Sequence, residues 1–260
     1  METFIETAPG IRLFCHVSGQ GQQAVLAPLA AWTGEFEVLA RGRRVIRYDP
    51  RGRGKSSAIE VNQASFDNDI ADLDAVRRGL GLDRVALIGW SYFGGVVARY
   101  AMLHPERVER LVTVGGMPIQ RARWMAAMQQ EYAARMTALP QDGKTRSMME
   151  VFRATRMGRE PVRPLPDFSG WPNERMEVVM PLFAKALESM GDWDWRADAA
   201  KLQVPALIVG GDADLCAESA REWATVLPNA KLFWMEGVGH FPMFEDPERF
   251  FAALEEFLNG

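Results

Sequence analysis

Ser91 lies in a sequence context that is typical of a serine nucleophile. The hexapeptide Gly89-Trp90-Ser91-Tyr92-Phe93-Gly94 follows an apolar run at residues 84–88 and precedes a helix-like segment that ends near residue 104. A strand, a sharp turn at the serine and a helix would hold the hydroxyl clear of the backbone, facing the helix N-terminus. The pattern predicts a nucleophile elbow with one departure, because Phe93 stands where a G-x-S-x-G motif has a small residue.

A serine hydroxyl needs a base within hydrogen-bond reach, and the chain has 3 histidines to supply one. His16 lies in a predicted strand, where a wall or edge position is its ordinary role. His104 precedes Pro105 at a helix end, where histidine is a common structural device. His240 lies in the glycine-bearing loop at residues 237–242, directly after a predicted strand. We therefore predict that His240 is the base.

A third group must orient the base, and two carboxylates are placed to do so. Asp212 and Asp214 follow the apolar run at residues 204–209. The order serine, aspartate, histidine along the chain is the one expected of a hydrolase with this elbow. Each predicted member follows a strand, and α/β sites form at that edge of a sheet.

Strand and helix patterns alternate along most of the chain. Apolar runs predict strands at residues 4–7, 11–17, 24–27, 44–48, 84–88, 110–114, 204–209 and 231–235. Helical spacing predicts helices over residues 66–80, 92–104 and 218–226, and a last helix with Asp246 as N-cap and Pro247 at its first position. This alternation predicts an α/β fold with a mostly parallel central sheet and helices on both faces.

The alternation stops between residues 117 and 196, where we find no convincing strand. This stretch is rich in methionine and tryptophan, and a proline-rich loop at residues 161–172 divides it. We predict a helical cap or lid at residues 117–196, inserted into a core made of residues 1–116 and 197–260.

At this point the chain resembles the α/β-hydrolase fold family, of the serine hydrolase and esterase type, over nearly its whole length. The matching segments are Asp49 to Ser56, Gly89 to Gly95, His104 to Val108, Gly211 to Asp214 and Gly237 to His240.

The resemblance implies roles for individual residues. The family's acid ends a G-x-x-D loop, which favours Asp214 and leaves Asp212 to bind turn backbone. The family's oxyanion donors are the N–H after the nucleophile, here that of Tyr92, and an N–H from the loop after the third strand. That loop carries no His-Gly here, so Leu29 is the expected donor and Ala30 the alternative.

The family's spacing also explains Phe93. The helix after the elbow usually reaches His-Pro thirteen and fourteen residues after the serine, as His104 and Pro105 do here. Phe93 is therefore a substitution in an intact elbow. Its ring either overpacks the turn, at a cost of roughly 1–3 kcal/mol, or points into a pocket with room for it.

A cap rich in methionine and tryptophan favours a hydrophobic or aromatic substrate, although burial of the cap against the core explains many of these residues equally well. Residues that could form the pocket wall are Trp32, Phe93, Met117, Trp124, Met180, Phe241 and Met243. Trp90 is equally consistent with core and with pocket wall. Cys216 is a rival nucleophile, but it has no histidine partner nearby in the sequence.

Composition excludes several classes of protein. The 260 residues are 48% hydrophobic and 25% charged with a net charge of −4, so we expect no nucleic acid or membrane partner. We find no signal peptide and only 2 cysteines, which we expect to be free, and therefore predict a cytoplasmic protein. We find no metal-ligand spacing and no dinucleotide motif, and expect no metal and no cofactor. A homodimer stays open.

These patterns predict a serine hydrolase that cleaves an ester, a lactone or a related acyl bond of a mostly hydrophobic small molecule. The same triad could serve C–C bond hydrolysis, amide cleavage or acyl transfer. Dehalogenases and epoxide hydrolases of the family carry aspartate at the elbow, where this chain has Ser91. A weakly catalytic ligand-binding receptor is the alternative outside enzymes, favoured by Phe93 and the absent His-Gly loop.

Overall fold

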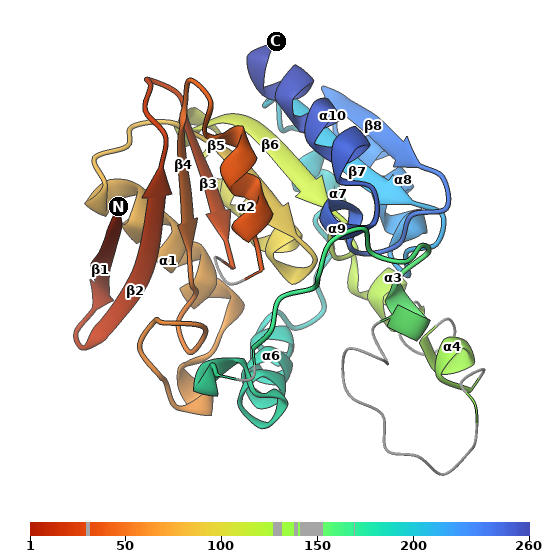
Figure 1. Ribbon diagram of the computed structural model, residues 1–260, viewed down its shortest axis with the longest axis horizontal. Helices are drawn as coiled ribbons and strands as arrows, with labels where there is room; N and C mark the ends of the chain where they lie inside the picture. The colour runs from red at the N-terminus through yellow and green to blue at the C-terminus, as the bar shows by residue number, and fades with distance from the viewer. Residues whose placement is uncertain (30–31, 127–131, 138–139, 141–152, 169) are drawn as a thin grey trace. The chain divides into compact units, whose positions relative to one another are not determined.

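The computed structural model (Figure 1) describes the chain except for residues 30–31, 127–131, 138–139, 141–152 and 169. Its strands form one sheet of eight in the order β1-β2-β4-β3-β5-β6-β7-β8. The strands are β1 (Glu2–Ala8), β2 (Ile11–Ser18), β3 (Ala24–Pro28), β4 (Arg44–Tyr48), β5 (Val85–Trp90), β6 (Val108–Val114), β7 (Ala206–Gly211) and β8 (Ala230–Met235).

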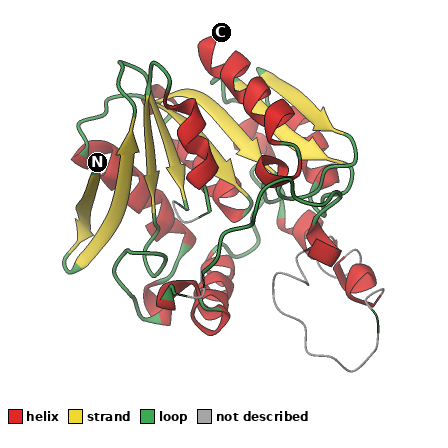
Figure 2. Cartoon of the chain, viewed as in Figure 1, coloured by secondary structure: helices red, strands yellow, loops and turns green. Residues whose placement is uncertain are grey.

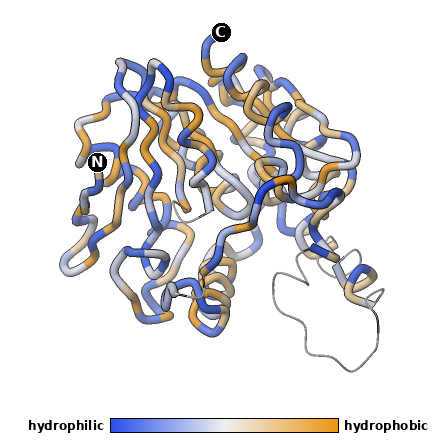
Figure 3. Tube along the Cα trace, viewed as in Figure 1, coloured by the Kyte–Doolittle hydropathy of each residue, from blue (hydrophilic) through white to orange (hydrophobic). Residues whose placement is uncertain are grey.

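The sheet is mixed and mostly parallel, which confirms the predicted fold class. β1 and β2 form an antiparallel hairpin, and β2 runs antiparallel to β4. Parallel pairing joins β3 to β4, β3 to β5 and β7 to β8. Every residue of β3, β5 and β7 is buried, as expected of strands covered on both faces. Figure 3 colours hydrophobic residues orange, and the apolar runs of β3 and β5 carry this colour.

Contacts between Cα atoms divide the chain into two compact units. Unit 1 comprises Met1–Gly89, Val96–Leu111 and Pro166–Asp192, and unit 2 comprises Trp90–Gly95, Val112–Leu165 and Trp193–Gly260. The predicted cap at residues 117–196 contributes to both units. Its boundaries remain a prediction.

Unit 1 contains helix α1 (Phe66–Gly79), whose N-terminus is capped by Ser65 accepting a hydrogen bond from the Asn68 amide. Ile70, Leu73 and Val76 are buried, so the predicted apolar face is confirmed. Unit 1 also contains α6 (Met176–Ser189) and short 3-10 helices at Gly34–Ala40, Val61–Gln63, Pro105–Arg107 and Pro172–Glu174.

Charged groups in the turn after β4 are neutralised by partners in the same unit. Arg51 makes a bidentate contact with Asp72, with both N···O distances at 2.7 Å. Arg53 contacts the buried Glu174 in the same way, at 3.0 and 2.7 Å. A bidentate pair fixes the orientation of both side chains and also neutralises their charges. The two arginine–carboxylate pairs therefore hold this turn in place.

Unit 2 holds β7, β8 and the helices α8 (Ala217–Val226), α9 (Pro242–Glu245) and α10 (Pro247–Asn259), together with the short helices α3 (Arg121–Ala126), α4 (Ala133–Thr137) and α7 (Arg196–Ala199). Figure 2 shows these elements by type. Between residues 117 and 196 the described residues contain no strand, only an isolated bridge between Gln120 and Asp194.

The predicted start of the last helix is confirmed, although its N-cap makes no side-chain hydrogen bond. Pro247 is the first residue of α10 and Asp246 holds the N-cap position, as predicted, but the Asp246 side chain makes no cap hydrogen bond. Its carboxylate instead lies 3.2 Å from Arg159 and 3.4 Å from Arg249. The two guanidinium groups draw the carboxylate away from the helix N-terminus. Among the described helices, none is long and apolar enough to cross a membrane.

Candidate active site

Ser91 lies in a strained turn between a strand and a helix. β5 ends at Trp90 and α2 (Tyr92–Leu103) begins at Tyr92, with Ser91 alone between them at a φ of 57°. A non-glycine residue in the left-handed region is uncommon and marks a backbone that its surroundings hold in place. The Ser91 N–H donates to the Val114 carbonyl, and its own carbonyl accepts from Gly94 and Met117. The predicted elbow is therefore present.

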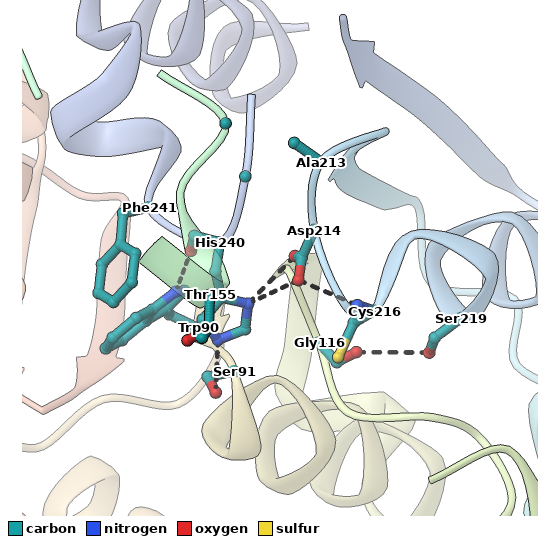
Figure 4. A network of polar contacts seen from close by, with 12 residues as sticks. Trp90, Ser91, Gly116, Thr155, Ala213, Asp214, Cys216, Ser219, His240 and Phe241 are labelled. Carbon is teal, nitrogen blue, oxygen red and sulfur yellow. Dashed lines mark hydrogen bonds and ion pairs between the residues drawn. The ribbon is translucent and has the colours of Figure 1, made fainter. Parts of the chain in front are cut away.

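The structure brings Ser91, His240 and Asp214 together within unit 2 (Figure 4). His240 Nε2 lies 2.9 Å from Ser91 Oγ, and His240 Nδ1 lies 3.0 and 3.1 Å from the two oxygens of Asp214. A carboxylate only accepts hydrogen bonds, so Nδ1 carries the proton and Nε2 is left to accept from the serine hydroxyl. This is the arrangement in which a serine can be deprotonated as it attacks.

Asp214 is buried and stays ionised. Burial by itself would raise the pKa of its carboxyl, but this is outweighed by the adjacent His240, a hydrogen bond from the Cys216 amide and the charge of Arg156, so the pKa lies below its usual value. The Cys216 N–H donates to Asp214 Oδ1 at 2.9 Å. A charged acid beside the imidazole stabilises the imidazolium that forms during attack.

Gly115 is a site residue that our sequence analysis missed. Its φ is 50°, and a Cβ at this position would lie 2.6 Å from Asp214 Oδ2 and 2.9 Å from His240 Nδ1. Both distances are shorter than real Cβ contacts, so a larger residue would push the acid and the base apart. The signal in the sequence was the Gly115-Gly116 pair directly after a strand.

Asp212 accepts a backbone hydrogen bond, as predicted, but the donor lies in a different loop and not in its own turn. Its Oδ1 accepts a hydrogen bond from the Gly237 amide. It thereby joins the loop after β7 to the loop that carries His240.

The other two histidines lie in unit 1. His16 is on β2, with its Nδ1 2.9 Å from Arg47, and β2 has neighbours on both sides in the sheet, so an edge position is ruled out. Its pKa is lowered by burial and by the Arg47 charge. His104 follows α2, and its ring packs against Tyr100.

The predicted oxyanion donors fall in different units. Tyr92 is the first residue of α2 and belongs to unit 2, where the N–H groups of a helix N-terminus point at the site of a developing anion. Leu29 belongs to unit 1 and has a φ of 69°. Its role stays a prediction, and Ala30 lies outside the described residues.

Phe93 is buried in the first turn of α2. Its ring packs edge-to-face on Tyr92, with centroids 5.1 Å apart. Two residues later, a Cβ on Gly95 would lie 2.4 Å from the Met117 sulfur, so Met117 packs directly on that glycine. The bulky side chains of the elbow are thus accommodated by packing on each other and on a glycine.

The remaining pocket candidates divide between the units. In unit 2, Met117, Phe241 and Met243 are buried and Trp124 is half-buried. In unit 1, Trp32 is buried against Phe168. Met180 on α6 is 46% exposed. Their roles as pocket wall stay a prediction.

Trp90 contacts His240 directly. Its indole Nε1 donates to the His240 carbonyl at 2.7 Å, and its ring lies against both His240 and Phe241. The residue before the nucleophile therefore supports the backbone of the predicted base.

Cys216 is buried and takes part in no disulfide. Among the described residues, Asp214, Cys216 and His240 offer potential metal-ligand atoms within 4.8 Å of one another. The imidazole would have to give up its hydrogen bonds to Asp214 or Ser91 to bind a metal there. The donor set fits a catalytic triad better than a metal site.

Comparisons with known proteins agree with this geometry. A family model described as alpha/beta hydrolase fold matches residues 23–247. A non-heme chloroperoxidase, CPO-A1 from Kitasatospora aureofaciens, is 28% identical, covering 97% of this chain and 98% of its own. An esterase from Exiguobacterium antarcticum aligns with a TM-score of 0.79 at 23% identity over both full chains. The enol-lactonase from Burkholderia xenovorans LB400 aligns with a TM-score of 0.71 at 21% identity, covering 99% of this chain and 100% of that one.

Proposed function

This chain belongs to the α/β-hydrolase fold family, and we propose that it is a serine hydrolase that cleaves an ester, a lactone or a related acyl bond of a mostly hydrophobic small molecule. The observation that carries the proposal is the continuous hydrogen-bonded path from Ser91 through His240 to Asp214. A purely structural role would not require a serine, a histidine and an aspartate to meet at a strained turn, whereas nucleophilic catalysis does.

In the first step Ser91 Oγ attacks the substrate carbonyl carbon. The hydroxyl proton passes to His240 Nε2, and Asp214 stabilises the imidazolium through Nδ1. The Tyr92 N–H holds the negative oxygen of the tetrahedral intermediate.

Collapse of that intermediate breaks the bond to the leaving group, which takes the proton from His240 Nε2. A water molecule then gives its proton to His240 and attacks the acyl-enzyme, and the imidazolium returns the proton to Ser91 as the acid leaves. Side chains of this chain handle every proton in the cycle, so the proposed reaction needs no cofactor.

The substrate class rests on the buried apolar residues near the elbow. Phe93, Met117 and Phe241 belong to unit 2 with the triad, and none offers a charge that would bind a charged acyl group. Relatives named as an esterase and an enol-lactonase support acyl chemistry on this fold. C–C bond hydrolysis, acyl transfer or ligand binding with slow turnover would use the same residues, and experiment must separate them.

A fluorophosphonate probe tests the nucleophile. We expect the native protein to be labelled and Ser91→Ala to remain unlabelled, because only an activated serine reacts with the probe. Ser219→Ala is a matched control, since Ser219 is a buried serine that bonds only weakly, at 3.4 Å, to the Gly116 carbonyl. Equal labelling of the native protein and Ser91→Ala would contradict the assignment of Ser91 as nucleophile. No labelling of either would favour the alternative of a ligand-binding receptor.

Substrate class is tested with p-nitrophenyl esters and lactones of graded chain length. A rise in kcat/KM with acyl length supports the hydrophobic pocket. Turnover confined to short, polar acyl groups would contradict it.

A further inference from the structure

Glu245 is a buried carboxylate that the proposed mechanism does not use. It is the last residue of α9, and it is 2% exposed. Its Oε1 accepts a hydrogen bond from the Phe241 N–H at 3.0 Å, and its Oε2 accepts one from the Gly239 N–H at 2.8 Å. The carboxylate therefore holds the residues on both sides of His240.

The same oxygen also binds a segment far away in the sequence. Oε2 accepts from the Gly158 N–H at 2.8 Å and from the Arg159 N–H at 3.0 Å. All four described hydrogen bonds of the Glu245 carboxylate thus come from backbone amides. Four bonds match the roughly four lone-pair sites of an ionised carboxylate, and they are shared unevenly, with three at Oε2 and one at Oε1.

The segment at residues 156–159 touches the base from a second direction. The His240 N–H donates to the Arg156 carbonyl at 2.7 Å. A Cβ on Gly239 would lie 2.3 Å from that carbonyl, and a Cβ on Gly158 would lie 2.4 Å from the Gly237 carbonyl. The two backbones are therefore as close as glycine permits. The Glu245 carboxylate bridges them, and the Arg159 side chain adds a hydrogen bond to the Glu236 carbonyl.

Helix capping explains only part of this arrangement. Phe241 is the N-cap of α9, so the Oε1 bond to its N–H is an ordinary means of satisfying a helix N-terminus. The three bonds to Oε2 lie outside that helix, and one of them adjoins His240. A residue that served only α9 would not need them.

We propose that Glu245 is a positioning residue for His240, which acts by locking the His240 loop to the segment at residues 156–159. The inference rests on the proposed function, because it assumes that His240 is the base. Loss of the lock would let the imidazole move away from Ser91 without removing any group that touches substrate. Displacement of a catalytic group by about 1 Å lowers turnover by about 100-fold.

Glu245→Gln tests the proposal with little change in volume. The amide keeps one accepting oxygen and turns an N–H₂ group toward amide donors, so at least one of the four bonds is lost. We expect kcat on the best ester substrate to fall by about 10- to 100-fold with KM within about twofold, per active site titrated with the fluorophosphonate probe. Glu245→Asp keeps the charge and is expected to lose less.

Glu174→Gln is the matched control. Glu174 is equally buried, and its described hydrogen bonds come from Arg53 and the Gly54 amide in unit 1. We expect this variant to lose stability but to keep native kcat per titrated site. A Glu245→Gln variant whose kcat per site matches that of Glu174→Gln would overturn the proposal.

The proton on His240 Nδ1 gives a readout that needs no turnover. In a Ser91→Ala background, we expect its downfield ¹H NMR signal to shift or broaden on Glu245→Gln and to stay unchanged on Glu174→Gln. An unchanged signal on Glu245→Gln would overturn the proposal. If the native protein fails to react with the probe, the proposed function fails, and the NMR result still decides whether Glu245 positions His240.

Discussion

Glu174 in unit 1 and Glu245 in unit 2 are both buried carboxylates, but they meet different partners. Glu174 is paired with the Arg53 guanidinium. Glu245 receives backbone amides from two segments. A fixed countercharge neutralises the Glu174 carboxylate and holds a turn, whereas backbone amides from two segments hold the Glu245 carboxylate and join those segments.

Asp72 and Asp214 repeat the contrast. Asp72 is paired with Arg51, which is permanently charged, while Asp214 faces His240, whose charge can change during a reaction. The partners of these two buried acids thus distinguish an ion-paired region in unit 1 from the proposed catalytic region in unit 2. The two regions should respond differently when an acid or its partner is removed.

Removing the base should have the largest effect. We expect His240→Ala to lower kcat by about 10⁶-fold, because the triad acts as a unit and its remaining members cannot activate Ser91. Ester hydrolysis and thermal unfolding should be measured on the same sample. A loss below about 100-fold would show that another group acts as the base.

Neutralising the orienting acid should have a smaller effect. Asp214→Asn keeps the size of the side chain, but its amide favours the wrong imidazole tautomer, so we expect kcat to fall by about 10⁴-fold. Asp212→Asn is the matched control and should stay within about tenfold of native, since the Asn oxygen can still accept from Gly237. Similar losses for both variants would remove the distinction between the two aspartates.

Breaking the ion pair between Arg51 and Asp72 in unit 1 should lower stability and leave turnover unchanged. Asp72 is 1% exposed, so Asp72→Asn leaves Arg51 buried without its countercharge and should lower the free energy of unfolding by about 3–5 kcal/mol. Urea unfolding gives this value, and kcat per titrated site should stay native. Asp83→Asn removes an ion pair whose acid is 85% exposed and should change stability by less than about 1 kcal/mol.

The features that were predicted correctly from the sequence are those set by residues close together in the chain. Ser91 and its elbow lie in one continuous segment, and the three histidines leave His240 as the one in a glycine-bearing loop after a strand. Predicted strands agree with the observed ones to within a few residues. β6 begins at Val108, two residues before the predicted start, because the polar Glu109 and Arg110 separate Val108 from the mostly apolar run at residues 111–114.

The missed features depend on contacts between distant segments. Trp90 binds a carbonyl 150 residues away, and Glu245 binds amides up to 87 residues away. In the sequence Glu245 is only an acid at the end of the apolar run at residues 241–244. The partner that binds its carboxylate is fixed by the fold, which also explains why Asp246 turned to Arg159 instead of capping its own helix.

The smallest expected effect is a change in how stability depends on pH under acidic conditions. Although burial opposes its charge, Asp214 has a pKa below the ordinary 3.8 because His240, the Cys216 amide and Arg156 favour the carboxylate. The unfolded chain therefore takes up a proton at this residue before the folded chain does, and the stabilisation present above the ordinary pKa is lost as the pH falls toward the folded pKa. We expect the free energy of unfolding, measured with urea between about pH 5 and pH 3, to fall more steeply for the native protein than for Asp214→Asn. Equal slopes would mean that the Asp214 carboxylate is no better stabilised in the folded chain than in the unfolded one. The contrast between Asp72, which is neutralised by Arg51, and Asp214, which is kept ionised beside His240, would then be lost.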